Sequence, residues 1–222
     1  MPNLFIVPTP IGNLEDITLR SIRILEECDL ILAEDTRVTK RLLNHLNISK
    51  PLLSFHAHNE HKVLDKTIER ITQNTSTVLV SDAGTPGISD PGYLLIRSCI
   101  ENNIKIECLP GATAIIPALI LSGFPTERFV FEGFLPHKKG RQTRLKTICD
   151  ETRTSVFYES PHRINKALIQ LKEFIDPERK VCVAREISKL YEEVIRGNID
   201  ELILFSENHE LKGEIVVVFS AV

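Results

Sequence analysis

Short apolar runs alternate along the chain with segments in which apolar residues recur every three or four positions. In the first half, the short runs predict strands at Leu4–Val7, Leu30–Ala33, Leu52–Phe55, Thr77–Val80 and Lys105–Cys108. Between the first two runs, residues Leu19, Ile22, Leu25 and Cys28 recur at the spacing of one helix face. Alternating strands and helices predict a mostly parallel sheet that is covered by helices on both faces.

The second half has a different order of elements. Strands are predicted at Phe129–Phe134, Ser155–Tyr158, Val181–Ala184, Tyr191–Ile195 and Glu214–Phe219, and helices at Ala112–Leu121, Arg141–Asp150, Pro161–Phe174 and Ile199–Ser206. The third and fourth of these strands are close enough in sequence to pair as antiparallel neighbours. We place a boundary near Pro110–Ala114, which gives two α/β domains, residues 1–111 and 112–222, with a ligand cleft expected between them.

Two helix starts carry a capping side chain followed by proline, at Asp90-Pro91 and Ser160-Pro161. Proline is well suited to the first helical position because its missing N–H needs no partner there. We therefore expect helices to begin at these two dipeptides.

Composition places the chain among ordinary globular proteins. Its 222 residues are 42% hydrophobic and 26% charged, and no apolar run reaches the roughly 20 residues that span a bilayer. The five cysteines, Cys28, Cys99, Cys108, Cys149 and Cys182, have no metal-ligand spacing. We expect most of them to be buried free thiols, no metal site, and a cytoplasmic location without a membrane partner.

Charge is distributed unevenly although the net charge is only −3. No acidic residue occurs between Thr36 and Asn59 or between Gly133 and Cys149, and both stretches contain several lysines and arginines. Such local basic surfaces can dock phosphates, but they are equally typical of solvated helix faces. Charge alone leaves both interpretations open.

A long turn between a predicted strand and a predicted helix is the strongest candidate for a ligand site. Residues Ser81–Gly92 contain three glycines and two prolines, far more than a tight connection needs. In open α/β sheets, ligands bind at the carboxyl ends of the strands. This position favours a small-molecule site.

The loop after the first strand, Val7–Asn13, does not match a dinucleotide-binding glycine pattern. Its two prolines, Pro8 and Pro10, remove two N–H donors, so the loop offers carbonyl oxygens more readily than amides. Carbonyls suit a cationic centre such as the sulfonium of S-adenosylmethionine better than a phosphate. No Walker A sequence is present, which argues against an NTPase.

Five motifs, in this order, resemble one known family. They are Val7–Leu14, Ala33–Arg37, Ser81–Gly92, Leu109–Ala114 and Phe157–Arg163. Together they are similar to the small-subunit ribosomal RNA methyltransferases of the tetrapyrrole methylase superfamily, over nearly the whole chain. The resemblance implies methyl transfer from S-adenosylmethionine to the 2′-hydroxyl of a cytidine in small-subunit rRNA. It also implies a two-domain α/β homodimer with the cofactor between the domains.

Members of that family often continue beyond the last predicted strand, whereas this sequence ends at Val222. If the additional segment helps to grip RNA, the basic surface or a dimer partner has to compensate here. The expectation of the cofactor is not affected.

The resemblance also implies roles for individual residues. The cofactor is expected to contact Pro10, Ile11, Asp82, Gly84, Thr85, Ala112, Thr113 and Ala114, and Tyr158 and Gly213 are candidates for its adenosine side. Asp82 can accept a hydrogen bond from the ligand and offset its positive charge, or it can simply stabilise the turn. Tyr158 is equally suited to a place in the core.

Methylation of a ribose hydroxyl benefits from a group that takes its proton. Asp35 and Glu159 are the candidates for that role, and each is equally suited to a salt bridge with Arg37 or Arg163. RNA phosphates are expected at Arg37, Arg41, Lys138, Lys139, Arg141, Arg144 and Arg163.

Three histidines, His56, His58 and His61, invite a metal interpretation, but no carboxylate or cysteine pattern completes a common site, and surface histidines are the simpler interpretation. Two other functions stay open at this point. One is a methylase of a small tetrapyrrole-like molecule, which would leave the basic run at Lys138–Lys146 without a role. The other is an RNA-binding protein without catalysis, which would fail to bind S-adenosylmethionine.

Overall fold

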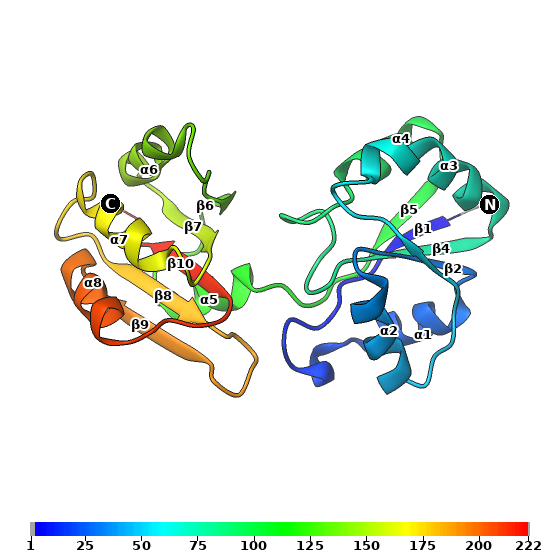
Figure 1. The fold of residues 1–222 in the computed structure, drawn as a ribbon, viewed down its shortest axis with the longest axis horizontal. Coiled ribbons are helices and arrows are strands. Elements are labelled where there is room, and N and C mark those ends of the chain that lie inside the picture. The colour runs from blue at the N-terminus through cyan, green and yellow to red at the C-terminus, as the bar shows by residue number, and fades with distance from the viewer. Residues whose placement is uncertain (1–2, 222) are drawn as a thin grey trace. The chain divides into compact units, whose positions relative to one another are not determined.

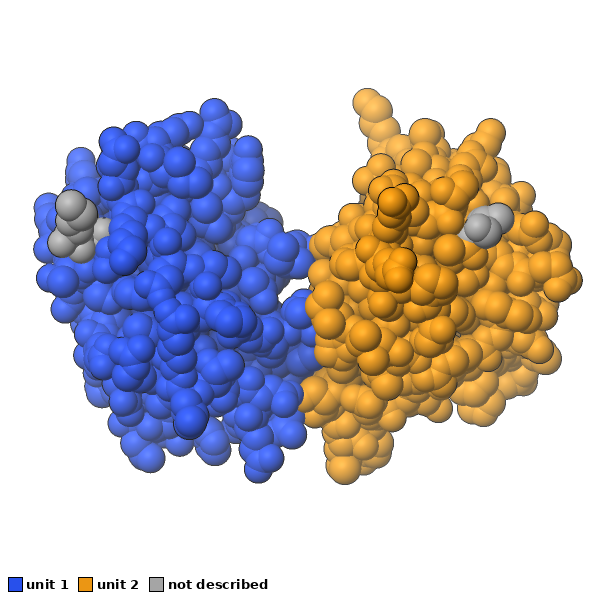
Figure 2. Space-filling view, turned by 180° about the vertical axis from the view of Figure 1, so that it is seen from behind, with its two compact units in different colours: residues 1–113 blue, residues 114–222 orange. Residues whose placement is uncertain are grey.

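The computed structural model describes residues 3–221 and divides them into two compact units. One unit ends at Thr113 and the other begins at Ala114, as the colours of Figure 2 show. Each unit contains one five-stranded sheet (Figure 1).

The N-terminal unit is built on a wholly parallel sheet in the order β3-β2-β4-β1-β5. Its strands are β1 (Asn3–Ile6), β2 (Leu30–Ala33), β3 (Leu52–Ser54), β4 (Ser76–Val80) and β5 (Lys105–Cys108). These bounds agree with the predicted strands to within a residue or two. The parallel sheet predicted from the alternation of short and periodic runs is confirmed.

Helices cover both faces of this sheet because its strands bury side chains on both sides. One face packs on α1 (Leu19–Glu27) and α2 (Thr36–His45), and the other packs on α3 (Glu60–Gln73) and α4 (Tyr93–Glu101). Successive residues of β1 alternate between the two cores: Phe5 joins the first and Ile6 the second.

The C-terminal unit has a mixed sheet in the order β6-β7-β10-β8-β9. The strands are β6 (Phe129–Phe134), β7 (Thr154–Glu159), β8 (Val181–Arg185), β9 (Glu193–Gly197) and β10 (Ile215–Phe219). Only β6 and β7 run parallel, and the expected antiparallel pairing of β8 with β9 is present. Strand β9 begins two residues later than predicted.

One large core fills this second unit. Helices α6 (Arg141–Asp150), α7 (Ile164–Lys172) and α8 (Ile199–Asn208) pack on the sheet through residues such as Leu145, Leu168 and Leu202. The apolar helix α5 (Ile115–Ser122) packs on β7, β8, β9 and β10 and contributes no residue to that core.

Neither helix begins at the capping residue and proline where it was predicted to begin, so both predictions are wrong. Helix α4 begins at Tyr93 after Gly92, whose φ of 137° only glycine adopts readily, and α7 begins at Ile164. The Leu94 N–H at the start of α4 donates to the buried Glu60 side chain at 3.1 Å. A residue 34 positions away thus supplies the acceptor that Asp90 was expected to supply locally.

Four of the five cysteines are buried thiols, as predicted, and Cys108 is exposed. Burial raises the pKa of Cys28, Cys99, Cys149 and Cys182 to about 11. These thiols are therefore protonated and inert near neutral pH.

Within residues 3–221, no helix is both long enough and apolar enough to cross a membrane.

Candidate functional site at the carboxyl edge of the parallel sheet

Strands β1 and β4 are neighbours in the N-terminal sheet, but the chain leaves them in opposite directions. From β1 it passes through α1 to β2, which lies beyond β4. From β4 it passes through α4 to β5, which lies beyond β1. Helices α1 and α4 cover opposite faces, so the loops after β1 and β4 diverge at the carboxyl edge. Ligands bind at such a switch point in open α/β sheets.

Hydrogen bonds tie these two loops together. Thr9 and Gly84 exchange both backbone N–H···O bonds at 2.9 Å, and the Thr9 hydroxyl donates to the Ser81 carbonyl at 3.1 Å. The Gly84 N–H therefore uses one acceptor site of the Thr9 carbonyl, in the loop that was expected to offer carbonyl oxygens. The loops after β1 and β4 form one structural unit at the switch point.

The loop after β5 closes against the same pair. The Thr85 hydroxyl donates to the Ala112 carbonyl at 3.1 Å, and a Cβ built on Gly111 would lie 2.7 Å from Cβ of Pro8. Gly111 is therefore required for the close approach of these two backbones. Seven predicted cofactor residues lie on these linked loops: Pro10, Ile11, Asp82, Gly84, Thr85, Ala112 and Thr113.

Three carboxylates follow β2 and β4 at this edge. The Asp35 N–H donates to Asp82 Oδ1 at 2.9 Å, and the Asp82 N–H lies 3.3 Å from Glu34 Oε2. This exchange holds the Glu34-Asp35 segment beside the loop after β4. The Asp35 side chain itself caps α2 by accepting from the Arg37 N–H at 2.8 Å.

The three carboxylates differ in charge environment. Arg37 donates to both oxygens of Asp35, at 3.0 and 2.6 Å, and these bonds hold the pKa of Asp35 well below its usual range. Burial raises the pKa of both Glu34 and Asp82. The predicted catalytic Asp35 is thus engaged by Arg37, whereas its neighbour Glu34 has no cationic partner among the residues described.

Glu159, the other predicted catalytic residue, lies in the C-terminal unit at the end of β7. Its side chain is fully buried and accepts from Arg141 Nη2 at 3.0 Å, from Arg163 Nη2 at 2.9 Å and from the Ser160 N–H at 2.8 Å. Both oxygens are occupied by these donors. This geometry assigns Glu159 to the structure of its unit and disagrees with a proton-accepting role.

The seven predicted RNA contacts divide between surface and interior. Arg37, Arg41, Lys138, Lys139 and Arg144 are exposed, and Arg163 is partly buried. Arg141 is only 6% exposed and also donates to the Pro136 carbonyl and to Gln170. Its guanidinium holds the loop before α6, and this burial does not favour the predicted contact with RNA.

The remaining three predicted cofactor residues, Ala114, Tyr158 and Gly213, lie in the C-terminal unit. The Tyr158 ring packs edge-on against Phe131, with centroids 5.3 Å apart. Both residues are only partly buried, and neither belongs to the core of the unit. The contacts of the three predicted residues with a cofactor stay predictions.

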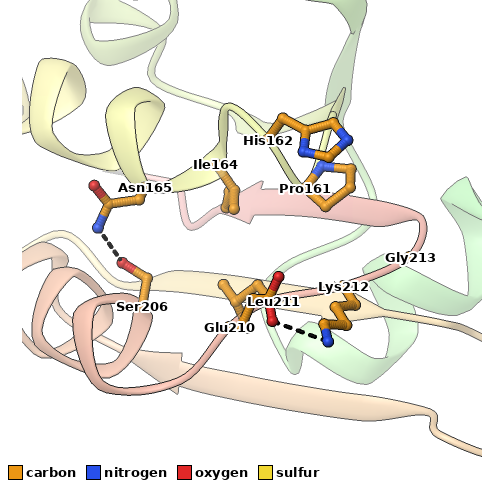
Figure 3. Close-up of a pocket in the computed structure, with 9 residues that line it drawn as sticks. All are labelled: Pro161, His162, Ile164, Asn165, Ser206, Glu210, Leu211, Lys212 and Gly213. Carbon is orange, nitrogen blue, oxygen red and sulfur yellow. Dashed lines mark hydrogen bonds and ion pairs between the residues drawn. The ribbon is translucent and has the colours of Figure 1, made fainter.

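Gly213 lines a hollow of about 460 Å³ in the C-terminal unit, where α7 begins and the chain enters β10 (Figure 3). Asn165 and Ser206 hydrogen bond across one end at 2.9 Å, and Glu210 pairs with Lys212 at 2.9 Å. A Cβ on Gly213 would overlap the Glu186 carboxylate, so glycine is required here by packing.

Sequence reasoning missed the position of His56. The interpretation as a surface histidine is incomplete, because His56 is half-buried at the end of β3 and its Nδ1 atom is fully buried. Its place directly after a strand of the parallel sheet was a signal that could have found it. Among the described residues, no group of three or more His, Cys, Asp and Glu side chains is placed to hold a metal ion.

Comparison with known proteins agrees with this architecture. The family model described as Tetrapyrrole (Corrin/Porphyrin) Methylases matches residues 3–203. The chain belongs to this family of methyltransferases, as the five motifs predicted.

Individual relatives are more specific. The chain is 47% identical over 220 residues to "Ribosomal RNA small subunit methyltransferase I" of Thermotoga maritima, covering 99% of both chains. It is 46% identical to the protein of the same name from Synechocystis, covering 98% of this chain and 78% of that one. A solved structure of uroporphyrin-III C-methyltransferase from Thermus thermophilus, complexed with S-adenyl homocysteine, aligns with a TM-score of 0.69 at 18% identity, covering 98% of this chain and 97% of that chain.

Proposed function

We propose that this protein transfers a methyl group from S-adenosylmethionine to the 2′-hydroxyl of a cytidine in small-subunit rRNA, acting as a homodimer in the cytoplasm. The observation that carries the proposal is the similarity, over 97–99% of the chain, to proteins named for methylation of this RNA. Small-molecule methylation is not favoured, since the structural neighbour that acts on a uroporphyrin is only 18% identical and shares the fold alone.

The loops at the switch point have the chemistry that a sulfonium cofactor needs. Residues 7–13, 81–92 and 109–113 contain no lysine or arginine, and the only charged side chains in them are carboxylates. Glu34 adds a further carboxylate beside Asp82. Carboxylates at such an edge favour a positively charged ligand. Asp82, Gly84, Thr85 and Ala112 are the residues that would hold the cofactor, which supplies the methyl group on a good leaving group.

The exposed lysines before α6 are the best-supported contacts for RNA. Lys138 and Lys139 carry no ion pair among the described residues, whereas Arg144 pairs with Glu132 at 2.6 Å. The loop that carries these lysines is fixed from beneath by Arg141, which binds Glu159 and the Pro136 carbonyl. Unpaired lysines on a fixed loop fit contacts with phosphates.

The test is transfer of labelled methyl from S-adenosylmethionine to small ribosomal subunits from cells that lack this gene, followed by mapping of the label. We expect label on one cytidine ribose, and none on subunits from cells that have the gene. Tight cofactor binding without label on the RNA would overturn the rRNA substrate.

The double variant Lys138→Glu/Lys139→Glu tests the RNA surface in the same assay. Each lost phosphate contact reduces the slope of log binding constant against log salt by about 1. We therefore expect weaker subunit binding, a salt slope lower by about 2, and unchanged cofactor affinity. The matched control is Lys62→Glu/Lys66→Glu on the exposed face of α3. If both double variants weakened subunit binding equally, the effect would come from the net charge of the protein and not from a docking surface at Lys138 and Lys139.

A further inference from the structure

Glu34 differs from the other two carboxylates at the edge in how few donors it has. Arg37 occupies both oxygens of Asp35, and the Asp35 N–H occupies Oδ1 of Asp82. Among residues 3–221, the only hydrogen bond to the Glu34 carboxylate is the long one from the Asp82 N–H, at 3.3 Å to Oε2. Its other oxygen, Oε1, is available to accept a proton or a hydrogen bond.

His56 comes to the same place from the neighbouring strand. Strand β3 pairs with β2 so that Ser54 lies opposite Ala33, which puts His56 and Glu34 just beyond the ends of paired strands. The His56 N–H binds the Asn59 side chain at 2.9 Å, and its carbonyl accepts from the Asn59 and Glu60 N–H groups. The backbone of His56 is therefore fixed, while its buried Nδ1 has no hydrogen-bond partner among the residues described.

The charges around Glu34 come from three segments. Asp82 after β4 and Asp35 on its own segment both disfavour its charged form, and His56 after β3 favours it. Burial has the largest effect and raises the pKa of Glu34. A half-buried carboxylate with a raised pKa is more basic than an ordinary surface carboxylate, which suits proton abstraction near neutral pH.

We propose that Glu34 is the group that takes the proton from the acceptor ribose hydroxyl. The inference rests on the proposed function. In the step, the ribose oxygen forms its bond to the methyl carbon as the carbon–sulfur bond breaks and its electron pair goes to sulfur. The hydroxyl proton passes to Glu34, so that the products are a methyl ether, a neutral thioether and a protonated carboxyl group.

The first test replaces the carboxylate and keeps its shape. In Glu34→Gln, the amide oxygen can still accept from the Asp82 N–H, so the segment keeps its place. We expect kcat to fall by about 10²–10³-fold, with KM for the RNA and cofactor affinity by calorimetry changed less than about threefold. In the wild type, kcat should rise with pH as Glu34 loses its proton, and this acid limb should be absent in the variant.

The matched control is Glu26→Gln, which makes the same chemical change on the exposed face near the end of α1. We expect wild-type kinetics from it. A Glu34→Gln enzyme with kcat within about threefold of the wild type, or one that retains the acid limb, would overturn the role of Glu34.

A second measurement needs no substrate. Carbon-13 NMR of the Glu34 carboxyl, followed against pH in the unliganded protein, gives its pKa directly. Because burial raises the pKa of Glu34, we expect the measured value to lie above the ordinary value for glutamate. A pKa at or below that ordinary value would overturn the role of Glu34 as the proton acceptor.

The outcomes separate this inference from the function on which it rests. A wild-type protein that methylates no RNA overturns the proposed function, and the NMR titration still decides whether the Glu34 carboxylate is more basic than an ordinary glutamate. A wild-type protein that methylates RNA, together with a fully active Glu34→Gln variant, overturns this inference alone.

Discussion

Each unit of the molecule places a glutamate at the end of a strand, and the two glutamates have opposite surroundings. Glu159 at the end of β7 is fully buried and accepts from two guanidinium groups and a backbone N–H. Glu34 after β2 is half-buried, and within residues 3–221 it has one long hydrogen bond and no ion pair. Residue type and position in a strand are therefore poor guides to role, and the number of donors around each carboxylate separates them.

Sheet topology explains the difference. In the parallel sheet all carboxyl ends lie along one edge, so Glu34, Asp82 and the loops after β1 and β5 meet there. In the mixed sheet β10 runs antiparallel to β7, and Glu159 is opposite Ile215 at the start of β10. Only one neighbouring strand, β6, brings its own carboxyl end to Glu159, and the arginines of α6 and of the turn before α7 surround it.

The largest effect is expected for Glu159→Gln, because it leaves two guanidinium groups without their counter-charge. Loss of one partner of a buried ion pair costs about 3–5 kcal/mol, and we expect that loss in the free energy of unfolding measured with urea. Glu151→Gln, which breaks the surface pair with Arg153, is the control and should have little effect. If the variant kept its stability but lost methyl transfer, Glu159 would be a catalytic residue, and the contrast with Glu34 would not hold.

An intermediate effect is expected for Gly111→Ala, which tests the linked loops of the other unit. The new methyl group would lie 2.7 Å from Cβ of Pro8, so the loops after β1 and β5 must separate. We expect a loss of about 1–3 kcal/mol of stability and about tenfold weaker binding of S-adenosylmethionine by calorimetry.

The control for this change is Gly123→Ala at the end of α5. Its Cβ meets nothing within 4 Å, and only the left-handed φ of 73° is strained. Cofactor affinity should be unaffected. Equal loss of affinity in both variants would show that the loops do not form the site.

The smallest effect is expected for Asp35→Asn, because the side chain lies at the surface and an asparagine can still cap α2. Arg37 lowers the pKa of Asp35 in the folded protein, so the stabilisation is present above the unfolded pKa of about 3.9 and is lost as pH falls through the lower folded value. The melting temperatures of wild type and variant should therefore differ slightly at pH 7 and converge in acid.

The Asp35→Asn variant also helps to decide whether Asp35 or Glu34 accepts the proton. If Asp35→Asn abolished methyl transfer while Glu34→Gln retained it, Asp35 would be the proton acceptor in spite of its ion pair. Thermal melts from pH 2 to 7 at low salt, with kcat measured on the same preparations, give both answers.

Most of the fold could be predicted from the sequence because the patterns that determine it are local. Short apolar runs located the strands, apolar residues recurring every three or four positions indicated helices, and the family motifs located the three loops at the switch point. The roles of the charged groups in the site could not be predicted in this way, because they depend on partners that are distant in the sequence. Arg141 contacts Glu159 across 18 positions, and the Asp35 N–H contacts Asp82 across 47. The order of strands that brings these loops together is likewise absent from any local pattern.

The paired bonds between Thr9 and Gly84 lay a short piece of antiparallel backbone across the edge of a parallel sheet. Two loops that belong to different strands thereby have one conformation between them, and neither can move without breaking bonds in the other. A cofactor bound at this edge, as proposed, would meet a surface that is already ordered, so little binding free energy would be lost to ordering of the chain. The two backbone hydrogen bonds that join the loops would also keep the proposed binding surface rigid.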